Sequence, residues 1–154
     1  MLDYVVQLDT TNQTASLELT VGGSVDTILF TYANNVISFP ARNAFDLDLP
    51  TLERFISVTT KWLSLLYENF PEPDPPYSPF KYSLEWKTPQ NKLYLDGKVD
   101  GLTFSANWAV GTTSVHFDHR QGAVFTRRMF RTFVNEYKEL LNAIHAVQNG
   151  NSII

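Results

Sequence analysis

Residues 80–99 read FKYSLEWKTPQNKLYLDGKV. Apolar side chains recur at every second position on both sides of a turn-forming Pro89-Gln90-Asn91 segment. They are Tyr82, Leu84 and Trp86 before this segment and Leu93, Leu95 and Val99 after it. A period of two places alternate side chains on opposite faces of a β-strand, and a Pro- and Asn-containing segment between two such runs is typical of a turn. The stretch therefore predicts an antiparallel hairpin with one apolar face.

The same pattern occurs 78 residues earlier in the chain. Tyr4 falls on Tyr82, Leu17 on Leu95 and Gly23 on Gly101, and the correspondence continues without a gap to Arg42, which falls on Arg120. Beyond Arg42 we place three extra residues in the first copy, within residues 43–49, so that Thr51 meets Thr126 and Phe55 meets Phe130. Apolar positions, a turn glycine and the start of a helix agree together, which indicates an internal duplication.

Each copy changes its period once. Third and fourth strands are expected around residues 27–32 and 36–39, and again around 102–108 and 113–118, because the alternation continues there. A helical stripe of apolar side chains follows, from Leu52 to Leu66 in the first copy and from Met129 to Ile144 in the second. Pro50 suits the first turn of the first helix, and Thr126 suits the N-cap of the second.

The pattern predicts an α+β fold made of two tandem β-β-β-β-α repeats, with antiparallel sheets that each pack on a helix. Residues 1–69 form the first repeat, residues 70–79 a proline-rich linker, and residues 80–154 the second repeat. A unit of about 60–65 residues buries only a thin core. We therefore expect both repeats to form one compact, pseudo-symmetric domain.

This element order resembles that of the Whirly proteins, and it is similar to a fused version of the dimeric transcription positive-cofactor-four family. The resemblance covers nearly the whole chain and is one of element order, so it assigns no individual residue. It implies binding of single-stranded DNA or RNA on the sheet surfaces and, in many relatives, further oligomerisation.

Composition limits the classes of function. The net charge is −4, but residues 1–70 carry three basic and eight acidic side chains, whereas residues 80–132 carry eight basic and four acidic ones. The chain has no cysteine, no apolar run of the roughly 20 residues that span a bilayer, and no basic-then-apolar signal segment at its start. These features predict a cytoplasmic protein without a membrane partner. We see no motif for catalysis or for a cofactor, and we expect the protein not to be an enzyme.

Alternation assigns a polar set of side chains to the outer face of the second sheet. The set is Lys81, Ser83, Glu85, Lys87, Lys92, Tyr94, Asp96, Lys98, Thr103, Ser105, Asn107, Ser114 and His116. Cations that follow a phosphate backbone and aromatic rings that stack on bases are what a sequence-tolerant single-strand binder needs. We therefore predict one cationic strip that contacts single-stranded nucleic acid. Its candidate contact residues are Lys81, Lys87, Lys92, Tyr94 and Lys98, helped by Arg120, Arg127 and Arg128.

Two other interpretations stay open. The outer face could be an ordinary solvated surface of a half-exposed sheet, where lysine is common. The chain could also be a protein–protein interaction or inhibitor module, because its first half is acidic and the same face of that half lacks cations. That face could pair with another subunit in a homo-oligomer. His116 and Asp118 would share one face of a strand, but a third metal ligand is not evident, so we predict no metal site.

Overall fold

The computed structural model describes residues 2–21, 27–40, 44–71, 73, 80–87, 91–99, 102–118 and 122–150. Its fold is α+β, with two antiparallel five-stranded sheets and two helices. Sheet A has the strand order β1 (Leu2–Asp9), β2 (Thr14–Val21), β3 (Thr27–Ala33), β4 (Val36–Phe39) and β10 (Ala123–Phe125). Sheet B has the order β5 (Phe45–Asp48), β9 (Ser114–Asp118), β8 (Leu102–Ala109), β7 (Lys92–Val99) and β6 (Phe80–Lys87). The helices are α1 (Leu49–Asn69) and α2 (Arg127–Gln148).

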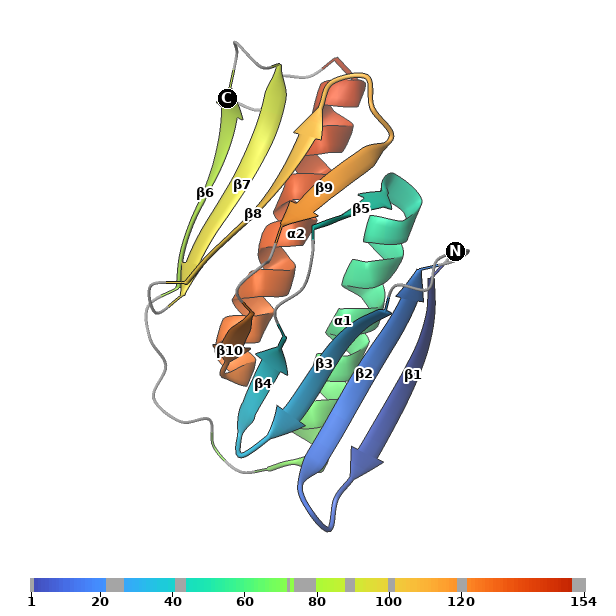
Figure 1. Ribbon diagram of the computed structural model, residues 1–154, viewed down its shortest axis with the longest axis vertical. Coiled ribbons are helices and arrows are strands. Elements are labelled where there is room, and N and C mark those ends of the chain that lie inside the picture. The colour runs from blue at the N-terminus through green and yellow to red at the C-terminus, as the bar shows by residue number, and fades with distance from the viewer. Residues whose placement is uncertain are drawn as a thin grey trace.

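The sheets and helices form two layers. Figure 1 shows both sheets toward the viewer and both helices behind them. Helix α1 contacts β1, β2, β5 and β9, and α2 contacts β4, β6, β7 and β10. Each sheet therefore has an inner face against the helices and an outer face away from them. Alternation along the strands explains this, since Leu17, Leu19, Leu93 and Leu95 all point inward and are completely buried.

The two sheets exchange their last strands. Strand β5 belongs to the first half of the chain but pairs with β9, and β10 belongs to the second half but pairs with β4. Four strands per repeat were predicted, and both fifth strands were missed. They are only four and three residues long and, unlike the equally short β4, they do not follow the preceding strand across a two-residue turn that would mark them. The exchange links the halves through main-chain hydrogen bonds as well as through their core.

The two halves correspond at a constant offset of 78 residues. The N-caps Asp48 and Thr126 differ by 78, as do the buried helical residues Phe55 and Phe133. The three extra residues placed within 43–49 are therefore wrong, because those positions form β5, whose counterpart is β10. A shift of three residues leaves an apolar stripe on nearly the same face of a helix, so the stripe alone could not reveal the error.

The core is a continuous aromatic cluster between the halves. The Phe117 ring stacks on Phe45 and on Tyr137, with both centroids 4.7 Å away. The Phe30 ring meets Phe39 edge-on at 4.7 Å and Phe130 at 5.1 Å. Trp62 and Trp108 are also buried, at 0% and 1% exposure, and belong to this core. Because the rings of each half fill space in the other, neither set completes its packing alone.

Both helices begin at a side-chain cap. The Asp48 Oδ1 atom accepts a hydrogen bond from the Thr51 amide at 2.8 Å, and the Thr126 hydroxyl accepts one from the Met129 amide at 3.2 Å. Pro50 lies in the first turn of α1. The structure therefore confirms the first-turn position of Pro50 and the N-cap role of Thr126.

We expect Asp48→Ala to lower the free energy of unfolding by about 1 kcal/mol at neutral pH, because an amide of the first turn loses its acceptor. Hydrogen bonds from the Thr51 side chain and amide lower the pKa of Asp48 below its ordinary value of 3.8. A lowered pKa stabilises the fold above the unfolded-state pKa, and this stabilisation is lost as the pH falls through the folded-state pKa. The difference between D48A and the parent, measured by urea unfolding, should therefore shrink below pH 3.8. The matched variant Thr126→Ala should show no such trend, and a pH-independent Asp48 effect would contradict this account.

Neither described helix is long and apolar enough to cross a membrane.

Candidate nucleic-acid interface

The outer face of sheet B carries the predicted contact residues in rows that cross the strands. The central row begins at the edge strand β5, where Asp46 lies opposite His116. His116 lies opposite Asn107, and Asn107 lies opposite Tyr94. Tyr94 lies opposite Glu85 on β6. Two ring side chains thus lie in one row on β7 and β9, about 10 Å apart, with an amide between them.

The lysines form two separate pairs. Lys87 lies opposite Lys92 at one end of the β6–β7 hairpin, and Lys81 lies opposite Lys98 at the other end. Lys92 and Lys98 are six positions apart on β7, which is about 20 Å along a strand. Glu85 and Asp96 lie on the same face between the pairs and are exposed. The prediction of one continuous cationic strip is therefore wrong, because alternation assigns a face but does not space charges along it.

Lys87 and Tyr94 contact each other on this face. The Lys87 ammonium nitrogen lies 4.3 Å from the centroid of the Tyr94 ring. Both side chains are partly exposed, as is Lys92. A cation at this distance from a ring is attracted by the electrons of its face, which holds the ammonium beside the aromatic surface. The pair thus places a positive charge and a stacking surface together.

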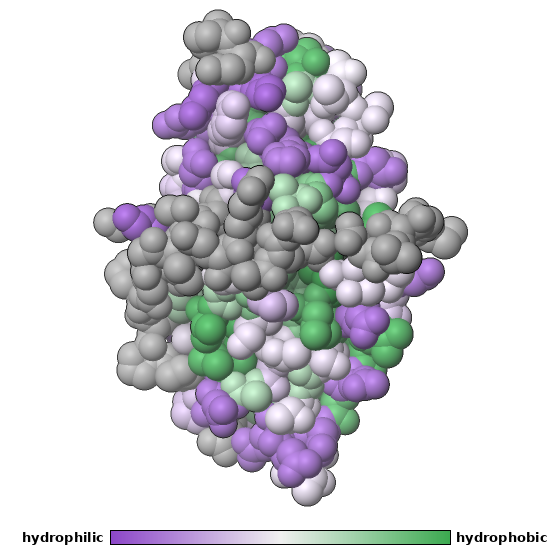
Figure 2. Space-filling view, viewed as in Figure 1, coloured by the Kyte–Doolittle hydropathy of each residue, from purple (hydrophilic) through white to green (hydrophobic). Residues whose placement is uncertain are grey.

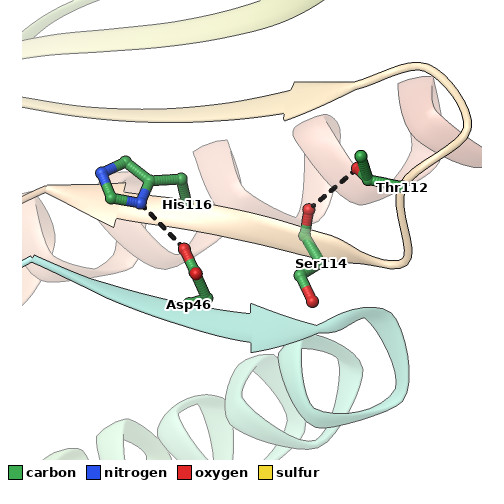
Figure 3. A network of polar contacts seen from close by, with 4 residues as sticks. All are labelled: Asp46, Thr112, Ser114 and His116. Carbon is green, nitrogen blue, oxygen red and sulfur yellow. Dashed lines mark hydrogen bonds and ion pairs between the residues drawn. The ribbon is translucent and has the colours of Figure 1, made fainter.

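His116 is held by a residue from the other half of the chain. Its Nδ1 atom lies 2.8 Å from the Asp46 Oδ1 atom, and the two side chains are 45% and 65% exposed (Figure 3). Asp46 belongs to the exchanged strand β5, 70 residues from His116. Sequence reasoning missed this contact because it treated the segment around Asp46 as an insertion. The negative charge of the Asp46 carboxylate, beside the His116 ring, repels phosphate at this end of the row.

Arg127 is buried and belongs to the packing of the helices. Its side chain is 2% exposed, and Nη1 donates hydrogen bonds to the carbonyl oxygens of Leu66 at 3.1 Å and Phe70 at 2.7 Å. The guanidinium also lies 4.4 Å from the centroid of the Tyr67 ring. Helix C-termini leave carbonyls without intrahelical donors, and Arg127 supplies donors to the end of α1. A ligand on the outer sheet face cannot reach it, which corrects its prediction as a contact residue.

Of the remaining predicted residues, one lies away from this face and two have side chains outside the described structure. Arg128 is exposed but lies on the first turn of α2, in the helix layer. Arg120 lies outside the described residues, as does the side chain of Lys81, although the main chain of Lys81 pairs in β6. Within the described ranges, no group of three or more His, Asp or Glu side chains is placed to hold a metal ion. Of the predicted contact residues, the described structure therefore places Lys87, Lys92, Tyr94 and Lys98 on the outer face of sheet B.

The outer faces of the two sheets differ in side-chain type. Figure 2 shows hydrophilic side chains toward both ends of the view, with separate hydrophobic patches in the lower half, where sheet A lies. The counterparts of Lys87, Lys92 and Tyr94 at the constant offset of 78 are Asp9, Thr14 and Ser16. The cations and the aromatic ring of this group thus lie on the outer face of sheet B, and their counterparts on sheet A are neither cationic nor aromatic.

No known protein family, no curated protein and no solved structure matches this chain.

Proposed function

We propose that the protein binds single-stranded DNA or RNA weakly and with little sequence preference. The binding surface is a patch of five side chains on the outer face of sheet B, here called the ring patch, made of Lys87, Lys92, Tyr94, Asn107 and His116. The observation that carries the proposal is the Lys87 ammonium, which lies 4.3 Å from the centroid of the Tyr94 ring and directly across the hairpin from Lys92. Cations beside stacking rings bind single strands whatever their bases, because every base has an aromatic face.

The architecture also supports this proposal. Five strands and a helix occur twice in the same order, with the same strand pairing in both halves. We interpret this as an internal duplication, similar in element order, apart from the short fifth strand of each half, to the Whirly proteins, which bind single strands on their sheets. The proposed role is that of a cytoplasmic binding protein, not an enzyme, and an accessory of phage or bacterial replication or recombination.

The acidic neighbours set the expected strength of binding. Glu85 and Asp46 lie at the two ends of the central row and repel phosphate. Two lysines, Lys87 and Lys92, therefore provide most of the phosphate neutralisation. Each neutralised phosphate of a single strand contributes a slope of about −0.7 to a plot of log affinity against log salt concentration. We expect a slope of about −1.4, which is shallow for a nucleic-acid-binding protein.

Fluorescence anisotropy with labelled oligothymidine and oligouridine tests the proposal. Tyr94→Ala should weaken binding about tenfold, within the range of about 1–3 kcal/mol for a lost base stack. Lys92→Glu should weaken binding and flatten the salt dependence. Lys98→Glu is the matched control, since it makes the same charge change at the far end of the same strand and should have a smaller effect.

Three results would contradict the proposal. They are an affinity that does not change with salt, equal effects of the Lys92 and Lys98 substitutions, or binding that tolerates the loss of Tyr94. Binding to double-stranded probes of the same length should be weaker, because paired bases do not expose their faces to Tyr94.

A further inference from the structure

Strand β1 is an open edge of sheet A. Within the described residues it pairs with β2 alone, in an unbroken register from Leu2↔Val21 to Asp9↔Thr14. Along its eight residues, no described strand pairs with the main-chain N–H and C=O groups of its other side. Proteins usually protect such edges with lysine, proline, a bulge or a covering segment, because an open edge can pair with another strand.

The equivalent edge strand of sheet B carries lysines, whereas β1 carries none. Strand β6 is also an edge, and it carries Lys81, Glu85 and Lys87. Strand β1 reads LDYVVQLD, so its charges stand at Asp3 and Asp9 and the five residues between them are uncharged. The barrier to strand pairing is therefore lower at β1 than at β6.

Apolar side chains are exposed on both faces of β1. Val5, on the outer face, is 56% exposed, and Tyr4 and Leu8, on the inner face, are 43% and 38% exposed. Leu2 and Val6 complete an inner row made only of apolar or aromatic residues. A strand added beside β1 would cover these side chains and pair the open main-chain groups at the same time.

We propose that a second copy of this chain pairs with β1, antiparallel, across a two-fold axis that passes through Val5. The axis is perpendicular to the sheet, so directly opposed residues lie on the same face. Val5 then lies opposite Val5 of the second copy, Tyr4 opposite Val6, Asp3 opposite Gln7, and Leu2 opposite Leu8. Every inner pair is apolar, and each Asp3 carboxylate faces an amide that can donate a hydrogen bond to it.

The neighbouring registers are worse. Moving the axis to Val6 places Asp3 opposite Asp9 twice, and like charges directly opposite destabilise a strand pair. Moving it to Tyr4 shortens the paired segment and leaves Gln7 and Leu8 without partners. Moving it by half a step would oppose residues that lie on different faces of the sheet. The sequence of β1 is thus self-complementary in a single register, which is why a second copy fits it.

The dimer is independent of nucleic-acid binding. It joins the two copies of sheet A into one ten-stranded sheet and leaves the outer faces of both copies of sheet B open. Loss of nucleic-acid binding in a Tyr94 variant would therefore leave the dimer intact, and loss of the dimer would leave each ring patch intact.

Light scattering on the full chain over a concentration series tests the dimer. The parent should approach twice the 17.5 kDa mass of one chain as concentration rises. Val5→Lys should hold the mass at that of one chain, because two ammonium groups would face each other at the axis. Val124→Lys is the matched control and should still dimerise, since Val124 is an equally exposed valine (53%) on β10, at the opposite edge of the same sheet. A parent that stays monomeric throughout, or a dimer lost in V124K and kept in V5K, would overturn the proposal.

Single cysteines test the register, because the chain contains no cysteine of its own. Val5→Cys should form a disulfide-linked dimer when the oxidant diamide is added, since directly opposed residues lie within disulfide reach. A mixture of Asp3→Cys and Gln7→Cys chains should form the mixed disulfide more readily than either forms its own. Cross-linking of Val124→Cys in place of Val5→Cys would overturn the proposed edge, and preferential Asp3–Asp3 linkage would overturn the register.

Discussion

Arg127→Ala is expected to lower the free energy of unfolding by about 3–5 kcal/mol, because it removes two charge-assisted hydrogen bonds and leaves their acceptors buried. The acceptors are the carbonyl oxygens of Leu66 and Phe70 at the end of α1. The truncation also removes the guanidinium from the Tyr67 ring, 4.4 Å away, and opens a cavity beneath it. Urea unfolding followed by circular dichroism measures the change.

Arg128 provides the control for this prediction. It is the next residue on α2 and is exposed, so Arg128→Ala should change the free energy of unfolding by about 0.5 kcal/mol or less. Arg127→Lys should be intermediate, because one ammonium lacks the planar fork of donors that arginine presents. Equal effects at the two arginines would show that the buried contacts do not hold α1 and α2 together.

Glu136 is expected to make the protein less stable as the pH rises from about 4.5 to about 7. The side chain is 3% exposed, and burial, aided by the charge of Glu139, raises its pKa from 4.5 to about 7 despite a hydrogen bond with Tyr82. Below pH 4.5 the carboxyl is protonated in both the folded and the unfolded chain, so it does not change the free energy of unfolding with pH. Between these values the unfolded chain ionises first, which lowers the free energy of unfolding, and above pH 7 the loss is complete. The shift corresponds to a loss on the order of 3 kcal/mol.

Glu136→Gln should remove this pH dependence, because an amide does not ionise in the range. At pH 8 the variant should be more stable than the parent, by an amount that approaches the same figure of about 3 kcal/mol. Glu139→Gln is the control, since Glu139 is exposed and acts on Glu136 only through its charge. It should move the midpoint of the stability loss to slightly lower pH without removing it. A parent whose stability does not change between pH 4.5 and 7 would contradict the burial of an ionisable Glu136.

Both predictions concern charged residues whose counterparts in the other half of the chain are uncharged. At the constant offset of 78, Arg127 corresponds to Leu49, and Glu136 corresponds to Val58, which is 3% exposed. The first half thus fills these positions with aliphatic side chains. Glu136→Val should accordingly be tolerated, because the equivalent position already packs a valine against the same kind of surface.

Alternation and helical periodicity were sufficient to place eight of the ten strands and both helices in their order. They worked where an element repeats its period several times, as in the runs Tyr4–Leu8 and Leu93–Val99, or where a two-residue turn marks a short strand, as before β4. They failed at β5 and β10, whose three or four residues carry little pattern and follow no such turn. They also failed to find the correct helix offset, since apolar stripes repeat every three or four residues and tolerate a shift of three.

For the candidate site, alternation assigned Lys92, Tyr94 and Lys98 to one face of a strand, and the strand register agrees. It could not distinguish Arg127, which is buried, from its exposed neighbour Arg128. The side-chain types of adjacent arginines are identical, and only the position of each on α2 relative to the end of α1 separates them. The contact of Asp46 could not be predicted either, because local periodicity does not pair residues far apart and its partner His116 lies 70 residues away.

Local order along this chain follows from the residues themselves: strands, turns and helix caps depend on neighbours within a few positions, and the likeness of the two halves is visible in the sequence at an offset of 78 residues. Which half completes which sheet, which arginine is buried and which carboxylate meets His116 depend on contacts between residues far apart in the chain. Periodicity contains no information about such contacts, since a side chain can be matched to a face without being matched to a partner. These contacts form only when the two halves pack against each other and exchange β5 and β10.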